Sequence, residues 1–183
     1  AVQHAWLNKH VADFKAYLGD KPVLVIGGNH DRINPVPILR AAGIDARQVL
    51  FSNQEILGFT YAGFRHITWG DNTAVDCEGK DVRWEGEAFD SELQTIVDSV
   101  FADPPDILIT HSPPHGILDK SNSGNRYGIS QLATALSFKP HHVRYHLFGH
   151  VHQEGGSIAK MESIGTTFSN AACTLNFIEV EKP

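Results

Sequence analysis

Apolar residues recur along the chain with the spacing of helices. Leu7, Val11, Phe14 and Leu18 lie at i, i+4, i+7 and i+11, which is one helical face, and Gly19 follows as a stop. A second stripe predicts a helix over residues 89–100, and the Pro104 and Pro105 pair ends it. Shorter patterns predict helices over residues 36–42 and 129–138.

Short apolar runs between these helices indicate strands. Runs at residues 23–26 and 106–110 are typical of buried strands, and residues 48–51 and 143–148 also predict strands. Looser alternation over residues 56–69 predicts a hairpin or meander, and residues 157–180 predict two or three antiparallel strands. Polar residues 70–86 predict a surface loop. Strands that alternate with helices indicate an α/β fold, and 183 residues without a linker predict one domain over residues 1–183.

Composition narrows the class of protein. The chain is 42% hydrophobic and 20% charged, which is typical of a globular domain. A formal net charge of -6 provides no basic surface, so we expect no nucleic-acid partner and no anionic membrane partner. No apolar stretch approaches the roughly 20 residues that cross a bilayer. The two cysteines form no CxxC motif, and together these features favour a soluble protein in the reducing cytoplasm.

Three of the predicted strands each end in a polar loop. These loops are GGNHD (residues 27–31), THSPPH (residues 110–115) and GHVH (residues 149–152). Sites in α/β sheets collect beyond the carboxyl ends of strands, so we expect the three loops to converge. His150 and His152 would project the same way from an extended segment, with Gly149 allowing the backbone to turn. The sequence therefore predicts a metal site.

Other chemistries fit less well. His146 and His150 have helical i, i+4 spacing, but Gly149 and the strand-like residues before it argue against a zincin helix. The chain also lacks a GxSxG nucleophile motif and a phosphate-binding Walker loop. Structural alternatives remain: Asn29 as a turn residue, His30 as a loop residue and His111 as a core histidine. His115 and Arg126 are weaker candidates for substrate contact, since a solvated loop explains them equally well.

The three loops, in this order, resemble the calcineurin-like metallophosphoesterase superfamily. The segments ILITHSPPHGILD, LFGHVHQEGG and NAACTLNF are similar to its small branch that includes the metallophosphoesterase-domain-containing proteins. The resemblance implies a four-layer α/β/β/α sandwich with two divalent metal ions (Mn, Fe, Zn or Mg). It also implies hydrolysis of a small phosphoester substrate by attack of a metal-bound hydroxide. The substrate class implied is a cyclic nucleotide or another small phosphodiester, with phosphomonoesters as an alternative.

The resemblance also implies roles for individual residues. By motif position, Asn29, His111 and His150 would bind the second metal, and His152 would bind the first. His30 would donate a proton or hydrogen bond beside the phosphate, and Asp31 would orient the His30 ring.

The two motifs with which this family begins, DxH and GDxxD, have no counterpart here. Gly19 and Asp20 end a predicted helix and precede the GGNHD strand, so they do not occupy the bridging position. We therefore expect a sandwich that lacks its first strands, with the missing motifs upstream of Ala1. We expect this chain alone to hold at most one well-bound ion and to be poorly active. The alternative is a catalytically inactive binding or assembly domain that retains a partial metal site.

Overall fold

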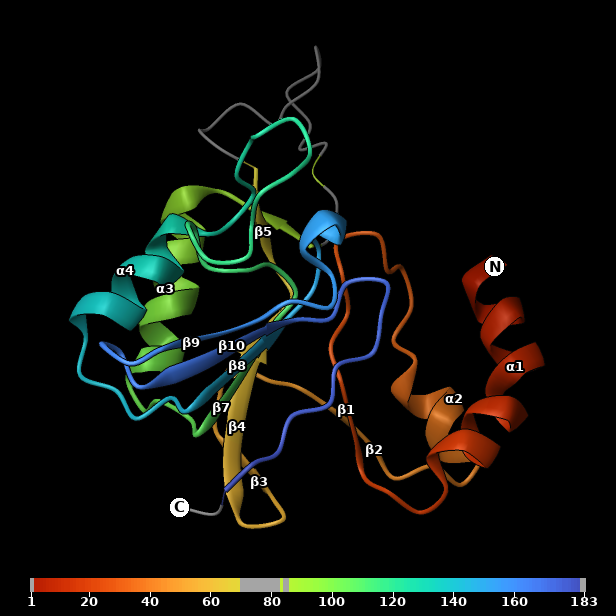
Figure 1. Cartoon of the computed structure of the whole chain (residues 1–183). Helices are drawn as coiled ribbons and strands as arrows, with labels where there is room; N and C mark the ends of the chain where they lie inside the picture. Colours follow the sequence, from red (N-terminus) through yellow and green to blue (C-terminus); the bar gives the residue numbers. More distant parts are fainter. Residues whose placement is uncertain (1, 70–82, 84–85, 182–183) are drawn as a thin grey trace.

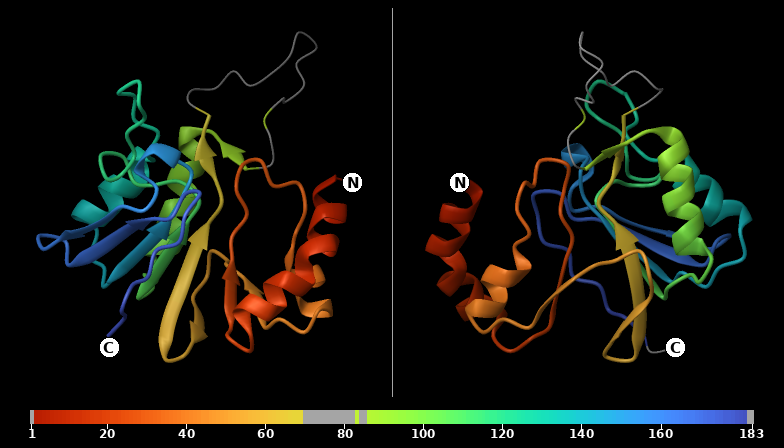
Figure 2. Two further views of the ribbon diagram at one scale, coloured as in Figure 1. Left: turned by 45° about the vertical axis from the view of Figure 1, so that its right-hand side comes forward. Right: turned by 180° about the vertical axis from the view of Figure 1, so that it is seen from behind.

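The computed structural model describes residues 2–69, 83 and 86–181, and statements about the structure concern these residues. Its elements form four layers, which run from left to right across Figure 1. Helices α3 (Asp90–Phe101) and α4 (Ser130–Phe138) cover one face of a six-stranded sheet. On the other side lie a two-stranded sheet and then helices α1 (Val2–Leu18) and α2 (Val36–Ala41). Figure 2 shows the same order from two further directions, and the predicted α/β/β/α arrangement is confirmed.

The six-stranded sheet has the order β3-β4-β7-β8-β10-β9. Its strands are β3 (Gln54–Ile56), β4 (Phe59–Phe64), β7 (Ile107–Thr110), β8 (Tyr145–Phe148), β9 (Ile158–Met161) and β10 (Thr166–Asn170). The four central strands are parallel, and antiparallel hairpin partners β3 and β9 close the two edges. Parallel strands bring their carboxyl ends to one edge. The loops after β7 and β8 therefore begin side by side.

Two separate apolar clusters hold the layers together. The larger one joins α3 and α4 to the sheet, and its fully buried side chains include Phe64, Leu93, Leu108, Leu132 and Phe168. The smaller one joins α1 and α2 to the sheet of β1 (Val23–Val25) and β2 (Ala46–Gln48), through Leu7, Val36, Leu39, Ile44 and Ala46. Two short parallel strands, β5 (Ile67–Thr68) and β6 (Glu87–Ala88), complete the strands among the described residues.

Most predicted elements are confirmed, and two details of the sequence prediction are wrong. Strand β1 is only partly buried, because β2 is its one strand partner among the described residues. The strand predicted over residues 48–51 lies over Ala46–Gln48, because it ends where β1 ends and Leu50 O instead accepts from Gly63 N of β4 at 2.9 Å. The two antiparallel strands β9 and β10 agree with the prediction of two or three strands over residues 157–180. The predicted loop over residues 70–86 lies largely outside the described residues, which include only Arg83 and Gly86 of it.

His146 is a core residue of β8. Its ring contacts the rings of Phe148 and Phe168 in edge-to-face geometry, and its Nε2 is 2.8 Å from Thr110 Oγ1. The Thr110 hydroxyl donates its proton to Ser112 O, so the Nε2–H of a neutral His146 must donate to Thr110. Complete burial lowers the pKa of His146 to about 3. The ring therefore helps to fix the loop after β7 while it stays uncharged.

We expect the protonation of His146 to weaken the fold in acid. The pKa in the folded state lies below the ordinary 6.5, so the unfolded chain binds this proton first and stability falls as pH drops from about 6.5 towards 3. At pH 4 the expected loss in the free energy of unfolding is about 3 kcal/mol. Urea unfolding at pH 7, 5 and 4 measures this loss. His146→Gln, which keeps an N–H donor but does not titrate, should show a shallower pH dependence. Equal slopes for the two proteins would contradict this account.

Among the described residues, every helix is too short or too polar to cross a membrane.

Candidate metal centre

Asn29, His111 and His150 come from three loops and meet at one point. Asn29 follows β1, His111 directly follows β7, and His150 lies two residues after β8. His111 Nε2 is 3.0 Å from Asn29 Oδ1 and 3.2 Å from His150 Nδ1. Backbone bonds set this geometry, because His111 N donates to Phe64 O and Gly149 N donates to His111 O. The structure thus brings together the three residues that the resemblance assigned to one metal.

Burial keeps the two histidines neutral. It lowers the pKa of His111 to about 4, and the neighbouring charges of His150, His30 and Arg65 lower it further while Asp31 opposes them. The pKa of His150 is also lowered, first by burial and then by the charges of His152 and His30. Both rings therefore have a lone pair at neutral pH, which is the form that binds a metal ion.

The two distances from His111 Nε2 suit ligands of a single divalent ion. Two ligand atoms at about 2.1 Å from one ion, separated by a tetrahedral angle, are about 3.4 Å apart. The observed separations of 3.0 and 3.2 Å are close to that value. Two imidazole nitrogens and one amide oxygen suit Zn, Mn or Fe, although the donor set does not choose among them.

His152 occupies a different backbone environment from the one predicted. His150 has a left-handed φ of 64°, and His152 begins a short 3-10 helix, η1 (His152–Glu154). The segment is therefore not extended, and the prediction that the two side chains project the same way from a strand is wrong. The role predicted for Gly149 is also wrong, because a Cβ there would meet only Ala172 at 3.8 Å. The turn falls on His150 itself, which is an unusual conformation for a residue with a Cβ.

His30 and Asp31 stand on the exposed side of the same loop. The Asp31 carboxylate accepts from Gly28 N at 2.6 Å, which tightens the turn that carries Asn29. His30 directly follows the candidate ligand Asn29 in the chain, and its charge lowers the pKa of both His111 and His150. Within the described ranges, no group of three or more His, Cys, Asp or Glu residues is placed to hold a metal ion. The cluster of Asn29 with two histidines is therefore the candidate centre.

Several residues that support the GGNHD loop carry no motif in the sequence. Arg65, just after β4, donates from Nη2 to Gly28 O at 3.0 Å and to Asp31 O at 2.7 Å. Gln3 of α1 holds the same loop through His30 O and Arg32 N. These contacts join residues about 30 positions apart, so short-range periodicity could not reveal them.

Asn170, at the end of β10, supports the GHVH loop in a similar way. Its fully buried amide donates to Val151 O at 3.0 Å and to Leu118 O at 3.1 Å, and its Oδ1 accepts from Ala172 N. The NAACTLNF segment begins at this residue. The hydrogen bonds of Asn170 show that the first residue of the segment supports the structure of the GHVH loop.

The two weaker candidates for substrate contact lie on the loop between β7 and α4. His115 is exposed, and its backbone N–H donates to Ile129 O at 3.1 Å. Arg126 pairs with the fully buried carboxylate of Asp119 at 2.5 Å. Asp119 also accepts from the backbone of Gly116 and Gly128. The Arg126 guanidinium is thus already paired with a buried carboxylate. Contact of His115 or Arg126 with a substrate stays a prediction.

Gly28→Ala should damage the centre without a ligand being changed. A Cβ at Gly28 would lie 2.8 Å from His111 Cε1, so the ring or the loop must move. Movement of a ligand by a neighbour typically costs 10–100-fold in metal affinity, and we expect a loss of roughly that size. Gly27→Ala is the matched control, because its Cβ would meet only the Arg65 side chain at 3.5 Å. Mn²⁺ titration monitored by calorimetry measures both, and equal affinities would contradict the close packing at Gly28.

Comparison with known proteins agrees with the fold and the loops. The sequence profile described as calcineurin-like phosphoesterase matches residues 1–154. The chain therefore belongs to the calcineurin-like phosphoesterase family, whose members are phosphoester hydrolases that generally bind divalent metal ions. A solved structure aligns with 92% of this chain and 65% of its own length, with a TM-score of 0.57. Its sequence identity is 18%, so this likeness shows the fold alone.

Individual relatives match shorter segments. The chain is 39% identical over 80 residues to metallophosphoesterase domain-containing protein 1 of Homo sapiens and of Mus musculus. That segment is 43% of this chain and 23% of each relative. The chain is also 43% identical over 51 residues to a UPF0046 protein of Caenorhabditis elegans. That second segment is 28% of this chain and 13% of the UPF0046 protein. The matched segments thus span less than a quarter of these relatives.

Proposed function

We propose that this protein hydrolyses small phosphoesters, with phosphodiesters such as cyclic nucleotides as the preferred substrate class. The contacts of His111 Nε2 with Asn29 Oδ1 at 3.0 Å and with His150 Nδ1 at 3.2 Å are the observation that carries this proposal. A divalent ion held there would polarise the phosphoryl oxygens and activate water for in-line attack. Family membership supports the reaction type, whereas the diester preference rests on the similarity to the small branch named above.

The residues around the centre suggest how the chain itself takes part. His30 is exposed beside His111 and His150, so it can donate a hydrogen bond to a phosphoryl oxygen or a proton to the leaving oxygen. Asp31 and Arg65 hold the loop that presents it, through Gly28 N and through the carbonyls of Gly28 and Asp31. His115 and Arg126 remain candidates to contact the substrate, and for Arg126 this requires sharing its guanidinium with Asp119.

An assay with bis(p-nitrophenyl) phosphate tests this function. We expect slow turnover that needs added Mn²⁺, Zn²⁺, Fe²⁺ or Mg²⁺ and that stops with a chelator. His30→Ala should lower kcat by about 100-fold or more, as loss of a general acid does. His142→Ala is the matched control, since His142 is exposed and belongs to none of the three loops. Turnover that is independent of metal, or equal in the His30 and His142 variants, would refute the proposal.

One observation favours the second candidate function, a binding or assembly domain with a partial metal site. The described part of the chain provides no cluster of three His, Cys, Asp or Glu ligands, so a second ion has no evident site there. A single ion can still hold a phosphate group, while in-line displacement is best served by two. The alternative predicts that inorganic phosphate binds in a metal-dependent way while the diester is never turned over.

A further inference from the structure

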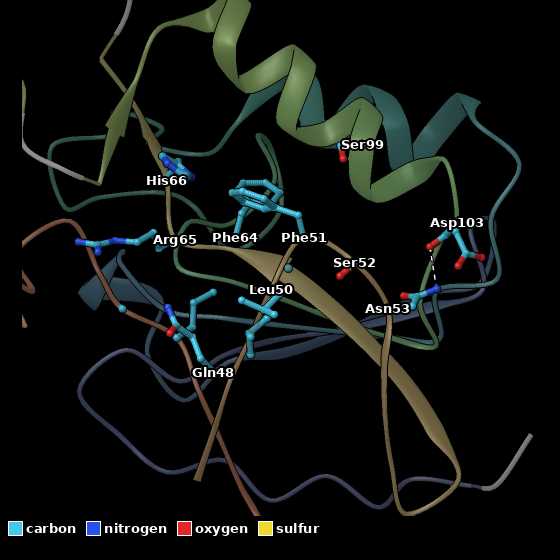
Figure 3. Close-up of a pocket in the computed structure, with 14 residues that line it drawn as sticks. Gln48, Leu50, Phe51, Ser52, Asn53, Phe64, Arg65, His66, Ser99 and Asp103 are labelled. Carbon is cyan, nitrogen blue, oxygen red and sulfur yellow. Dashed lines mark hydrogen bonds between the residues drawn. The ribbon is translucent and has the colours of Figure 1, made fainter. Parts of the chain in front are cut away.

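A surface pocket of about 590 Å³ lies where helix α2 and strands β2 and β3 meet. Its lining residues come from the segment 34–40, which includes most of α2, and from the segment 47–54, which joins β2 to β3. Gln48 and Leu50 line this pocket and also the neighbouring cavity that Figure 3 shows. The volume falls within the range of small-molecule sites, about 300–1,000 Å³. None of the three motif loops contributes a residue to the pocket.

The charge of this pocket is opposite to that of the chain. The whole chain has 21 acidic and 15 basic residues, yet the described residues that line the pocket include two arginines, Arg40 and Arg47, and no acidic residue. Arg47 is neutralised by Asp45 at 3.1 Å, and it also donates from Nη1 to Glu55 O at 3.3 Å. Arg40 has no acidic partner among the described residues. The pocket therefore presents one uncompensated positive charge.

The side-chain oxygens of the pocket already accept hydrogen bonds within the protein. Asn34 Oδ1 accepts from Val36 N at 3.0 Å, and Gln48 Oε1 accepts from Asn34 Nδ2 at 2.9 Å. Gln54 Oε1 accepts from the Tyr61 hydroxyl at 2.8 Å. An occupant of the pocket thus meets side-chain acceptors that are already paired with donors of the chain.

Side-chain donors, in contrast, remain available. Arg40 donates from Nε to Ala46 O at 2.7 Å, which holds its guanidinium in place, and its two Nη groups have no partner in the described part of the chain. The same holds for Nε2 of Gln48. Arg40 and Gln48 are both exposed, so an occupant can reach these nitrogens. A guanidinium presents its N–H groups as a planar fork that matches the two oxygens of a carboxylate.

The rest of the lining is largely apolar. Leu50 is 49% exposed, and Pro37 is also exposed, so both side chains have apolar surface that a ligand can cover. Covering such surface removes it from water, which is favourable. The pocket therefore suits a ligand that combines an acidic head group with a short apolar body.

We propose that this pocket binds a small organic carboxylate. The carboxylate oxygens accept from the Nη groups of Arg40 and from Nε2 of Gln48, and the apolar body lies on Leu50 and Pro37. A single negative charge matches the one uncompensated charge of Arg40, whereas a phosphate monoester brings nearly two. The site needs neither a metal ion nor hydrolysis, so it goes beyond the proposed function and is independent of it.

Titration of the ¹⁵N-labelled chain with hexanoate, at low salt and without divalent ions, tests this inference by NMR. We expect saturable shifts at the Leu50 amide, at the Gln48 side-chain amide and at Arg40 Nε–H, with none at His111 or His150. Hexanamide has the same body without the charge, and it should bind at least about tenfold more weakly, as loss of a charge-assisted hydrogen bond implies. Hexyl phosphate should also bind more weakly than hexanoate.

Two substitutions test the head-group contacts. Arg40→Gln removes the charge and should weaken hexanoate binding by about tenfold. Gln48→Glu keeps an acceptor for Asn34 Nδ2 but places a like charge in the pocket, and it should weaken binding by at least about tenfold. Lys9→Gln is the matched control, because it removes the same charge from an exposed position of α1 and should leave binding unchanged.

Four results would overturn the proposal. They are the absence of saturable shifts with hexanoate, equal binding of hexanoate and hexanamide, tighter binding of hexyl phosphate, and equal effects of Arg40→Gln and Lys9→Gln. Shifts at His111 and His150 without shifts at Arg40 and Gln48 would place the ligand at the candidate metal centre and would also overturn it. The dispersion of each spectrum shows whether a variant is folded. If Arg40→Gln is not folded, the exposed Gln48→Glu substitution decides.

Discussion

Gly63→Ala is expected to prevent stable folding. Gly63 is buried in β4 opposite Ile109 of β7, and a Cβ there would lie 1.6 Å from Ile109 O. Neither backbone can move away while the strands remain paired, because Ile109 also pairs with β8 on its other side. The chain must then break the β4–β7 pairing at the centre of its larger core. We expect a loss of more than about 4 kcal/mol, the range in which single substitutions become exceptional.

The control for this prediction is another glycine to alanine change. At Gly149 a Cβ would meet only Ala172, at 3.8 Å, and the backbone does not have a left-handed φ. Gly149→Ala should therefore change the free energy of unfolding by less than about 0.5 kcal/mol. Urea unfolding followed by circular dichroism compares the two variants with the wild type. A folded Gly63→Ala protein within about 1 kcal/mol of the wild type would show that the register of β4 with β7 is wrong.

The sequence predicted the helices well, because a helical pattern is contained within one segment of the chain. The helical stripe from Leu7 to Leu18 and the one over residues 89–100 became α1 and α3, because one face of each meets a core. Strand ends were harder to predict. The apolar residues Val49 to Phe51 follow β2 instead of forming it, because β1 ends at Val25 and Leu50 O accepts from Gly63 N of β4. Where a strand ends thus depends on its partner, which a local pattern does not contain.

The candidate centre shows the same division. Three motifs predicted loops at the ends of strands, and the structure places Asn29, His111 and His150 from those loops together. The packing that makes room for them could not be predicted. Gly28 leaves space for the His111 ring, and Gly86 leaves space for the backbone of Asn29, whose Cα a Cβ there would approach to 2.7 Å. The requirement for glycine at these two positions arises only after segments far apart in sequence have packed together.

His111→Ala should remove the binding of a divalent ion. His111 Nε2 is the atom that contacts both other candidate ligands, Asn29 Oδ1 and His150 Nδ1. Its loss leaves only these two atoms to bind the metal ion. Mutation of a residue that only orients a ligand lowers metal affinity by about 10–100-fold. Loss of the ligand itself should cost more, so we expect affinity for Mn²⁺ or Zn²⁺ to fall by at least about 100-fold. Without metal, the variant should fold normally, because a neutral and partly buried imidazole is replaced by a small apolar side chain.

Thermal unfolding with and without metal separates binding from folding. A metal ion at 100 times its dissociation constant stabilises a protein by about 2.7 kcal/mol, which raises Tm by roughly 5–10 °C in a chain of this size. We expect that rise in the wild type, its loss in His111→Ala and a smaller reduction in His152→Ala. The difference between the two variants follows from geometry, because His111 Nε2 contacts both Asn29 Oδ1 and His150 Nδ1, whereas His152 begins the short 3-10 helix η1. Equal losses in both variants would place His152 among the ligands of the same ion, and an undiminished rise in His111→Ala would exclude the proposed centre.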